Sequence, residues 1–225
     1  MNSDVAPTTV LDAALDAHRR LRAIIEGLTD AQVGEPSALP GWTRGHVLAH
    51  LANVTGAMAR QAELEGTEVE PYPGGRPARD AAIEAAAGRS AAGHRAAIEA
   101  AAARLATAWS GVRDWNTPVG YRDGVLRDTA CAVWREVEIH ALDLDLVPVA
   151  WSPEFRDHVV DFLAARVPEG VRVTLVSTDD GRRWTIGSGR DVELRGGSDD
   201  LVAWLAGRAP RTALTGEPPE LSPWP

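Results

Sequence analysis

The hydrophobic residues of this chain change their spacing near residue 150, and this change limits the possible folds more than any other feature. In the first two thirds, apolar residues such as Leu11, Leu15 and Ile25 recur at the spacing of one helix face. Beyond residue 150, segments such as VRVTLVS and VELRG alternate apolar and polar residues between glycine-rich turns, as strands do. The sequence predicts a mainly α, α+β chain, with a helical domain over 1–150 and a small α+β domain over 151–225.

Four segments of the first part have the length and periodicity of bundle helices. They cover residues 9–27, 43–65, 80–109 and 126–147, with a Pro/Gly-rich linker at 70–77. Thr43 is expected to cap the second helix. These helices predict a four-helix bundle. In the second part, helices over 153–166 and 199–207 are expected beside three short strands.

Two pairs of polar residues, His46 with His50 and Glu136 with His140, are spaced one helical turn apart. At about 100° per residue, His50 faces the edge of the core and His140 lies in the buried sector, with Glu136 at its margin and His46 at the boundary. An imidazole and a carboxylate on one helix can meet an imidazole from another inside a bundle. We therefore expect His50, Glu136 and His140 to bind a divalent metal with one coordination position open. The alternative is two hydrogen-bonded core histidines and a carboxylate at the rim.

Composition excludes several classes of function. The net charge of -9 disfavours nucleic acid and anionic membranes as partners. Cys131 is the single cysteine, so the chain has no internal disulfide and no paired cysteines for zinc or redox chemistry. The N-terminal segment lacks the apolar run of a signal peptide, and no stretch has the length of a membrane span. The expectation is a cytoplasmic protein of bacterial type.

Three motifs in order carry a resemblance to a known family. The strings LPGWTRGHVLAHLA and REVEIHALDL, followed by the closing WLAGR and LTGEPPELSPWP, resemble the mycothiol-dependent maleylpyruvate isomerases, a branch of the DinB-like metal-binding helical bundles. The resemblance covers essentially the whole chain. It implies His50, Glu136 and His140 as the metal ligands, the set that helix geometry selects. It also implies a substrate-holding basic residue in the C-terminal lobe, at Arg208, although Arg211 lies nearby.

The resemblance implies a chemistry as well. The metal would be zinc or another divalent ion, the cofactor mycothiol, and the reaction the cis–trans isomerisation of maleylpyruvate to fumarylpyruvate. A thiolate activated by the metal would add to the alkene, giving an enolate that rotates and then eliminates the thiol. The expected partners are a small-molecule substrate and a low-molecular-weight thiol, and the expected state is a monomer. Two alternatives stay open: a mycothiol S-transferase, and a protein that binds metal or a small ligand without catalysis.

Other polar residues have two interpretations each. His46 is either a cofactor-contacting residue or a histidine at the core boundary. Asp143, one turn after His140, either orients a ligand or is a solvated charge at the helix end. By the same helix count Arg135 points to the side of its helix opposite Glu136, which predicts a surface ion pair or one between the lobes. His18 and His94 are expected in the core, and Cys131 is expected to be structural.

Overall fold

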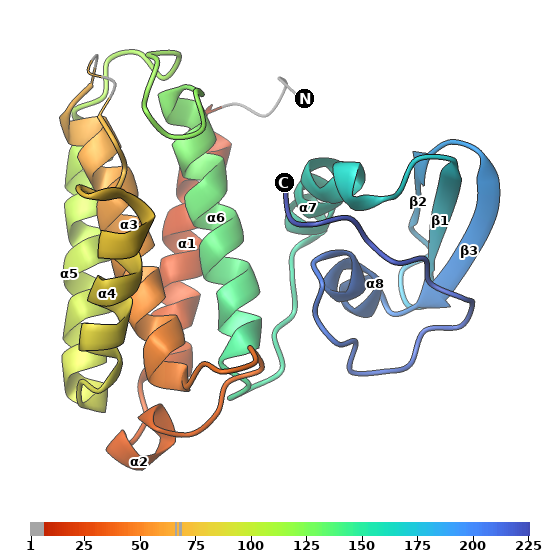
Figure 1. The fold of residues 1–225 in the computed structure, drawn as a ribbon, viewed down its shortest axis with the longest axis horizontal. Coiled ribbons are helices and arrows are strands. Elements are labelled where there is room, and N and C mark those ends of the chain that lie inside the picture. Colours follow the sequence, from red (N-terminus) through yellow and green to blue (C-terminus); the bar gives the residue numbers. More distant parts are fainter. Residues whose placement is uncertain (1–6, 66, 68) are drawn as a thin grey trace. The chain divides into compact units, whose positions relative to one another are not determined.

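Four long helices form the first part of the chain (Figure 1). The structure, a computed structural model, describes residues 7–65, 67 and 69–225. The four long helices are α1 (Pro7–Ile25), α3 (Arg44–Glu63), α5 (Ala91–Ser110) and α6 (Leu126–Asp143), with two shorter helices, α2 (Asp30–Val33) and α4 (Gly75–Ala87). Helix α1 packs on α5 and α6, and α3 packs on the same two helices, so the four close a ring. Helix α4 packs on the outside of α3.

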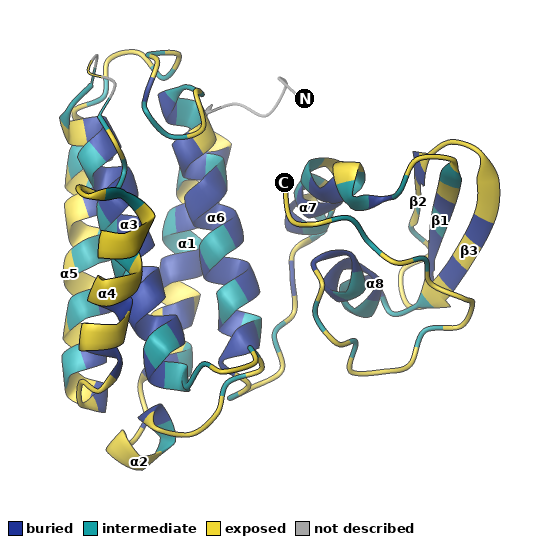
Figure 2. Ribbon diagram, in the orientation of Figure 1, coloured by how far each residue is buried: buried dark blue, intermediate teal, exposed yellow. Residues whose placement is uncertain are grey.

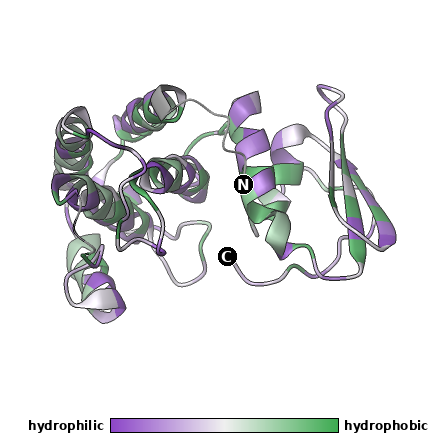
Figure 3. Cartoon of the chain, turned by 90° about the horizontal axis from the view of Figure 1, so that it is seen from above, coloured by the Kyte–Doolittle hydropathy of each residue, from purple (hydrophilic) through white to green (hydrophobic). Residues whose placement is uncertain are grey.

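Burial follows the helical period of the sequence. Leu21, Leu51, Leu105 and Val133 are fully buried, one from each long helix. In Figure 2, α4 and α5 carry exposed residues on one face, whereas α3 and α6 are buried or intermediate along almost their whole length. Viewed from above, along the bundle, each helix carries hydrophobic and hydrophilic residues around its circumference (Figure 3). The apolar faces meet inside the ring, and their removal from water is the main force that stabilises such a bundle.

The expected third helix over 80–109 is two helices. Helix α4 ends at Ala87, and α5 starts at Ala91 after the cap residue Ser90, whose hydroxyl accepts the backbone N–H of Gly93. Ser90 offers a local acceptor at the point where the chain turns, and this competes with a continuous helix. Helix α4 also takes in the end of the segment expected to be a linker. Similarly, α6 ends at Asp143 rather than at residue 147, and Asp145 has φ +49°.

A glycine lets α4 lie close to α3. A Cβ atom on Gly45 would lie 2.1 Å from the carbonyl oxygen of Ala87, so the first turn of α3 accepts the end of α4 only because residue 45 has no side chain. Ala49 of α3 and Ile83 of α4 are buried in the same small cluster, covered by Trp42. This packing places the outer helix over the segment of α3 that carries His46 and His50.

The second part of the chain, Ala150–Pro225, is a separate compact unit. It contains α7 (Pro153–Leu163), a short 3-10 turn (Ala164–Arg166), β1 (Val171–Ser177), β2 (Arg183–Gly187), β3 (Arg190–Gly196) and α8 (Ser198–Leu205). The sheet order is β2-β1-β3, with β1 antiparallel to β2 and parallel to β3. Phe155, Leu163, Leu175 and Leu194 are fully buried between helices and sheet. The fold class, mainly α with a four-helix bundle and a small α+β lobe, is confirmed.

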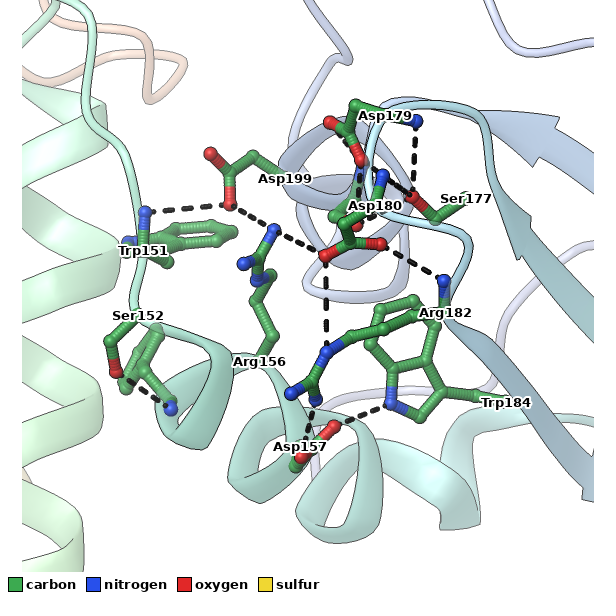
Figure 4. A network of polar contacts seen from close by, with 12 residues as sticks. Trp151, Ser152, Arg156, Asp157, Ser177, Asp179, Asp180, Arg182, Trp184 and Asp199 are labelled. Atoms are coloured by element: carbon green, nitrogen blue, oxygen red, sulfur yellow. Dashed lines mark hydrogen bonds and ion pairs between the residues drawn. The ribbon is translucent and has the colours of Figure 1, made fainter.

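A polar network connects α7 to the turn between β1 and β2 (Figure 4). Asp157 accepts hydrogen bonds from Trp184 Nε1 at 2.8 Å and from Arg182 at 2.6 Å. Arg156 lies 3.4 Å from Asp180 and 3.7 Å from Asp199. Each carboxylate named here has a cationic partner, so the network fixes the helix against the sheet.

None of the described helices is long and apolar enough to cross a membrane.

Candidate metal centre

His50 of α3 meets Glu136 and His140 of α6 inside the bundle. His50 Nε2 lies 2.8 Å from Glu136 Oε2, and His140 Nε2 lies 3.3 Å from the same oxygen. The two imidazole rings are 4.6 Å apart between centroids and nearly perpendicular. One potential ligand atom from each residue lies within 4.8 Å of the others. Two imidazole nitrogens and a carboxylate oxygen at this separation suit a divalent transition metal.

Hydrogen bonds across the two helices hold the ligands in register. Arg44, the first residue of α3, donates from Nε to the carbonyl oxygen of Leu144 at 2.7 Å, just beyond the end of α6. The backbone N–H of Ala38 donates to the carbonyl oxygen of Asp143 at 2.9 Å. These contacts connect the N-terminal end of α3 to the C-terminal end of α6. Because the helices are antiparallel, His50, two turns into α3, then lies opposite the last two turns of α6.

The charges of the three residues fit a metal-binding set. Burial alone would raise the pKa of Glu136, but hydrogen bonds from His140 and His50 hold its pKa well below the ordinary value, so it is a carboxylate. Burial lowers the pKa of His50, and its hydrogen bond to Glu136 offsets only part of this shift. Burial would also lower the pKa of His140, but hydrogen bonds to Asp143 and Glu136 raise it. The site therefore places an anionic carboxylate beside two imidazoles, one with a lowered and one with a raised pKa, and each imidazole binds metal through a nitrogen that carries no hydrogen.

Asp143 orients His140. Its carboxylate is fully buried and accepts a hydrogen bond from His140 Nδ1 at 2.7 Å. The interpretation of Asp143 as a solvated charge at the helix end is wrong, because the carboxylate is buried and hydrogen-bonded to ring nitrogen Nδ1 of His140. An imidazole whose Nδ1–H is held by a carboxylate presents Nε2 as its metal-binding atom, in a fixed orientation and with raised basicity.

Arg79 of α4 contacts the other imidazole. Its guanidinium lies 3.1 Å from His50 Nδ1 and also donates to Asp80 at 2.6 Å. Since a guanidinium only donates, His50 Nδ1 accepts, and the single N–H of the neutral ring lies on Nε2 and points at Glu136. Sequence reasoning did not find Arg79, since it lies 29 residues after His50, near the start of a helix whose first turn had been assigned to a linker. No spacing rule connects residues on two helices that only tertiary packing brings together.

His46 lies outside the group of three. Its ring nitrogen Nδ1 is 2.8 Å from the Thr43 hydroxyl and completes the cap of α3, while Nε2 is 3.2 Å from Glu84 of α4. The rings of His46 and Trp42 stack with their centroids 6.1 Å apart, and the rings of Trp42 and His50 meet edge-on with their centroids 5.7 Å apart. The structure therefore places His46 in the cap of α3 and in the packing of α4. Its contact with a cofactor stays a prediction.

Two tyrosines and a second arginine interact electrostatically with Glu136. Burial raises the pKa of Tyr72 to about 12, against the opposing charge of Arg79. Burial also raises the pKa of Tyr121, and Arg122 and Arg135 oppose that shift. Arg135 is buried, so its assignment to a surface ion pair is wrong. It interacts with Tyr121, in the loop that precedes α6.

Two further histidines of the bundle and the cysteine lie apart from the centre. His18 is buried, and its Nε2 forms a hydrogen bond of 3.1 Å with the hydroxyl of Thr55. Nε2 of His94 forms a hydrogen bond of 3.2 Å with the carbonyl oxygen of Ala87. Both are core histidines, as expected. Burial raises the pKa of Cys131, which keeps its thiol protonated at neutral pH.

Arg208 belongs to the second unit. It follows α8, donates to the carbonyl oxygen of Ala206 at 2.8 Å, and lies over the ring of Trp224 at 5.8 Å. Arg166 lies over the same ring at 5.6 Å. The part that Arg208 plays in holding substrate stays a prediction.

Comparison with known proteins gives one family. The model of the mycothiol maleylpyruvate isomerase N-terminal domain matches residues 14–145. Two solved structures, of the mycothiol-dependent maleylpyruvate isomerase and of a histidine-to-alanine mutant of it, each align with TM-score 0.81 and 25% identity over 98% of both chains. No curated protein matches. The family model covers more than half of the sequence and includes all three candidate ligands. The chain therefore belongs to the mycothiol maleylpyruvate isomerase family.

Proposed function

We propose that this protein is a metal- and mycothiol-dependent isomerase that converts maleylpyruvate, or a close analogue, to fumarylpyruvate. The observation that carries the proposal is the convergence of His50, Glu136 and His140 inside the bundle. Family membership and the likeness to two isomerase structures along the whole chain support an enzyme of this type. Both solved structures are of a mycothiol-dependent maleylpyruvate isomerase.

His50, Glu136 and His140 would hold the metal, zinc or another divalent ion, through two nitrogens and one oxygen. Asp143 would keep His140 in the orientation and tautomer that binding requires. A divalent ion held by these residues would supply a positive charge that lowers the pKa of a nearby thiol. Trp42, against the edge of His50, would help to limit the access of water to that ligand.

The reaction needs a temporary loss of double-bond character, because rotation about a carbon–carbon double bond is blocked. Mycothiol, when bound, would supply the thiol nucleophile that removes the double-bond character and is regenerated at the end of the reaction. Carbonyl groups beside the alkene take up the negative charge, and a cationic side chain stabilises it. We assign this role to Arg208, whose planar guanidinium can bind a carboxylate or an oxyanion through two hydrogen bonds.

The test is to incubate the zinc-loaded protein with mycothiol and maleylpyruvate while following fumarylpyruvate and free thiol together. Fumarylpyruvate at constant thiol is the expected result. Consumption of the thiol would identify an S-transferase instead. Absence of both changes would leave only a binding protein and would overturn the proposal.

Arg208 is tested in the same assay. Arg208→Ala is expected to raise the KM for maleylpyruvate about 10-fold or more, as loss of a charge-assisted carboxylate contact does. Arg211→Ala, three residues on, is the matched control and is expected to leave KM unchanged. Equal KM values for Arg208→Ala and the unmodified protein would remove Arg208 from the site.

A further inference from the structure

Arg79 brings a guanidinium to the candidate metal centre from a helix outside the four-helix ring. Its side chain is 23% exposed, whereas Arg76, one turn earlier on the same helix, is 87% exposed. Arg79 contacts His50 at 3.1 Å, and its guanidinium lies over the ring of Tyr72 at 5.8 Å. The close approach of α4 to α3 at Gly45 fixes this arrangement.

The bond between Arg79 and His50 cannot persist when His50 binds a metal through Nε2. A neutral imidazole carries one N–H, and a metal on Nε2 leaves that hydrogen on Nδ1. A nitrogen that carries hydrogen does not accept from a guanidinium, so Arg79 loses this acceptor. Asp80 still accepts from one N–H of Arg79, but the N–H that faced His50 is left without its partner, and a partly buried N–H favours another anionic or carbonyl acceptor at the same place.

The surroundings favour an anionic acceptor from outside the protein. A divalent ion with two neutral imidazoles and one carboxylate carries a net charge of about +1, and Arg79 adds a further positive charge. Asp80 already accepts from Arg79, but its side chain is 54% exposed and cannot replace an acceptor on the inner side. The Tyr72 hydroxyl, which stays protonated at neutral pH, can add a neutral donor. These groups match a carboxylate, which accepts two hydrogen bonds from one guanidinium.

We propose that Arg79 is a substrate-binding residue that exchanges His50 Nδ1 for a carboxylate of a small dicarboxylic acid when the centre is loaded with metal, with Tyr72 beside it. This inference rests on the proposed function, because it deepens the assignment of the substrate at the same centre. It places the recognition of one carboxylate within the bundle itself, on helix α4.

The experiment uses the full chain, loaded with zinc and free of thiol, and maleate as the dicarboxylate probe. Calorimetry measures maleate binding, and competition with a chromogenic chelator measures zinc affinity. The variants are Arg79→Met, Arg79→Lys and Tyr72→Phe, and Arg76→Met on the exposed face of α4 is the matched control. Nitrogen NMR of His50 reports which ring nitrogen carries hydrogen, with and without zinc.

Arg79→Met is expected to weaken maleate binding about 10- to 100-fold, as loss of a two-point ionic hydrogen bond does, and to leave zinc affinity equal or higher. Arg79→Lys should bind maleate more tightly than Arg79→Met, since lysine keeps the positive charge but lacks the planar guanidinium that donates two parallel hydrogen bonds. Tyr72→Phe should weaken binding only a few-fold, and Arg76→Met should not change it. The hydrogen of His50 should move from Nε2 to Nδ1 on zinc loading.

Three results would overturn the inference: maleate binding that is unchanged in Arg79→Met, no maleate binding to the zinc-loaded protein, or zinc loss in Arg79→Met. The last would show that Arg79 supports the ligands instead. Failure of the proposed function looks different. Arg79-dependent maleate binding without isomerisation of maleylpyruvate would remove the isomerase assignment alone, whereas isomerisation with an unchanged KM in Arg79→Met would remove this inference alone.

Discussion

The two sides of the candidate centre hold equivalent imidazoles in opposite ways. His140, on α6, gives its Nδ1–H to the buried carboxylate of Asp143, a residue of the same helix. His50, on α3, accepts at Nδ1 from Arg79, a residue of another helix. The ring of His140 is therefore already held with Nε2 toward the centre and needs only to lose the hydrogen on Nε2, whereas His50 must change both its tautomer and its partner. The His140 side of the centre is preorganised for metal, whereas the His50 side rearranges when metal binds.

The largest effect is expected from removing any of the three ligands. His50→Ala, Glu136→Ala and His140→Ala should each lose stoichiometric zinc, because two protein ligands bind much more weakly than three. Metal analysis after dialysis measures this directly. Glu99→Ala, an exposed carboxylate on α5, is the control. A variant that retains one zinc per chain would exclude that residue as a ligand.

The next effect isolates the preorganised side. Asp143→Asn keeps the shape of the residue but removes its charge, and it should lower zinc affinity about 10- to 100-fold, as loss of an orienting carboxylate does. Competition with a chelator measures the change. Arg79→Met, on the His50 side, should raise zinc affinity or leave it unchanged. Equal losses in the two variants would show that the two sides are held alike.

The pH dependence of stability sharpens the same comparison in the metal-free protein. The folded-state pKa of His140 is raised, so the stability from its pairing is fully present below about pH 6.5 and is lost as pH rises through the folded pKa. Asp143→Asn should therefore cost about 2 kcal/mol at pH 6 and less at higher pH. The pKa of His50 is lowered, so its own contribution to stability has the opposite pH dependence. That contribution is the same in the unmodified protein and in Asp143→Asn, and it cancels from the difference between them.

Urea unfolding in the presence of a chelator, from pH 6 to pH 9, measures that difference. A cost that is constant or that grows with pH would contradict the pairing of His140 with Asp143.

The smallest effect is expected at His46. Glutamine at this position can still complete the cap of α3 with Thr43, so His46→Gln should change the free energy of unfolding by no more than about 0.5 kcal/mol. Zinc affinity and the KM for mycothiol should stay the same, because both ring nitrogens of His46 are engaged by Thr43 and Glu84. A raised KM would support the prediction that His46 contacts the cofactor.

Most of the fold could be predicted from the sequence, because helical period, cap residues and strand alternation are local properties. Four bundle helices and the change to a sheet after residue 150 follow from them. The break between α4 and α5 could not be placed, since the alanine-rich segment from 80 to 109 favours helix throughout. There the cap at Ser90 and the packing of α4 on α3 decide the structure.

The candidate site divides in the same way. The sequence by itself determined His50, Glu136 and His140 as candidates, since residues one turn apart share a helix face and an inward imidazole or carboxylate needs a partner. Only the tertiary structure decided that Asp143 is buried and hydrogen-bonded to His140, that Arg135 is buried and that Arg79 contacts His50. Contacts between helices depend on how side chains and glycines let them pack, and no local pattern in the chain records that.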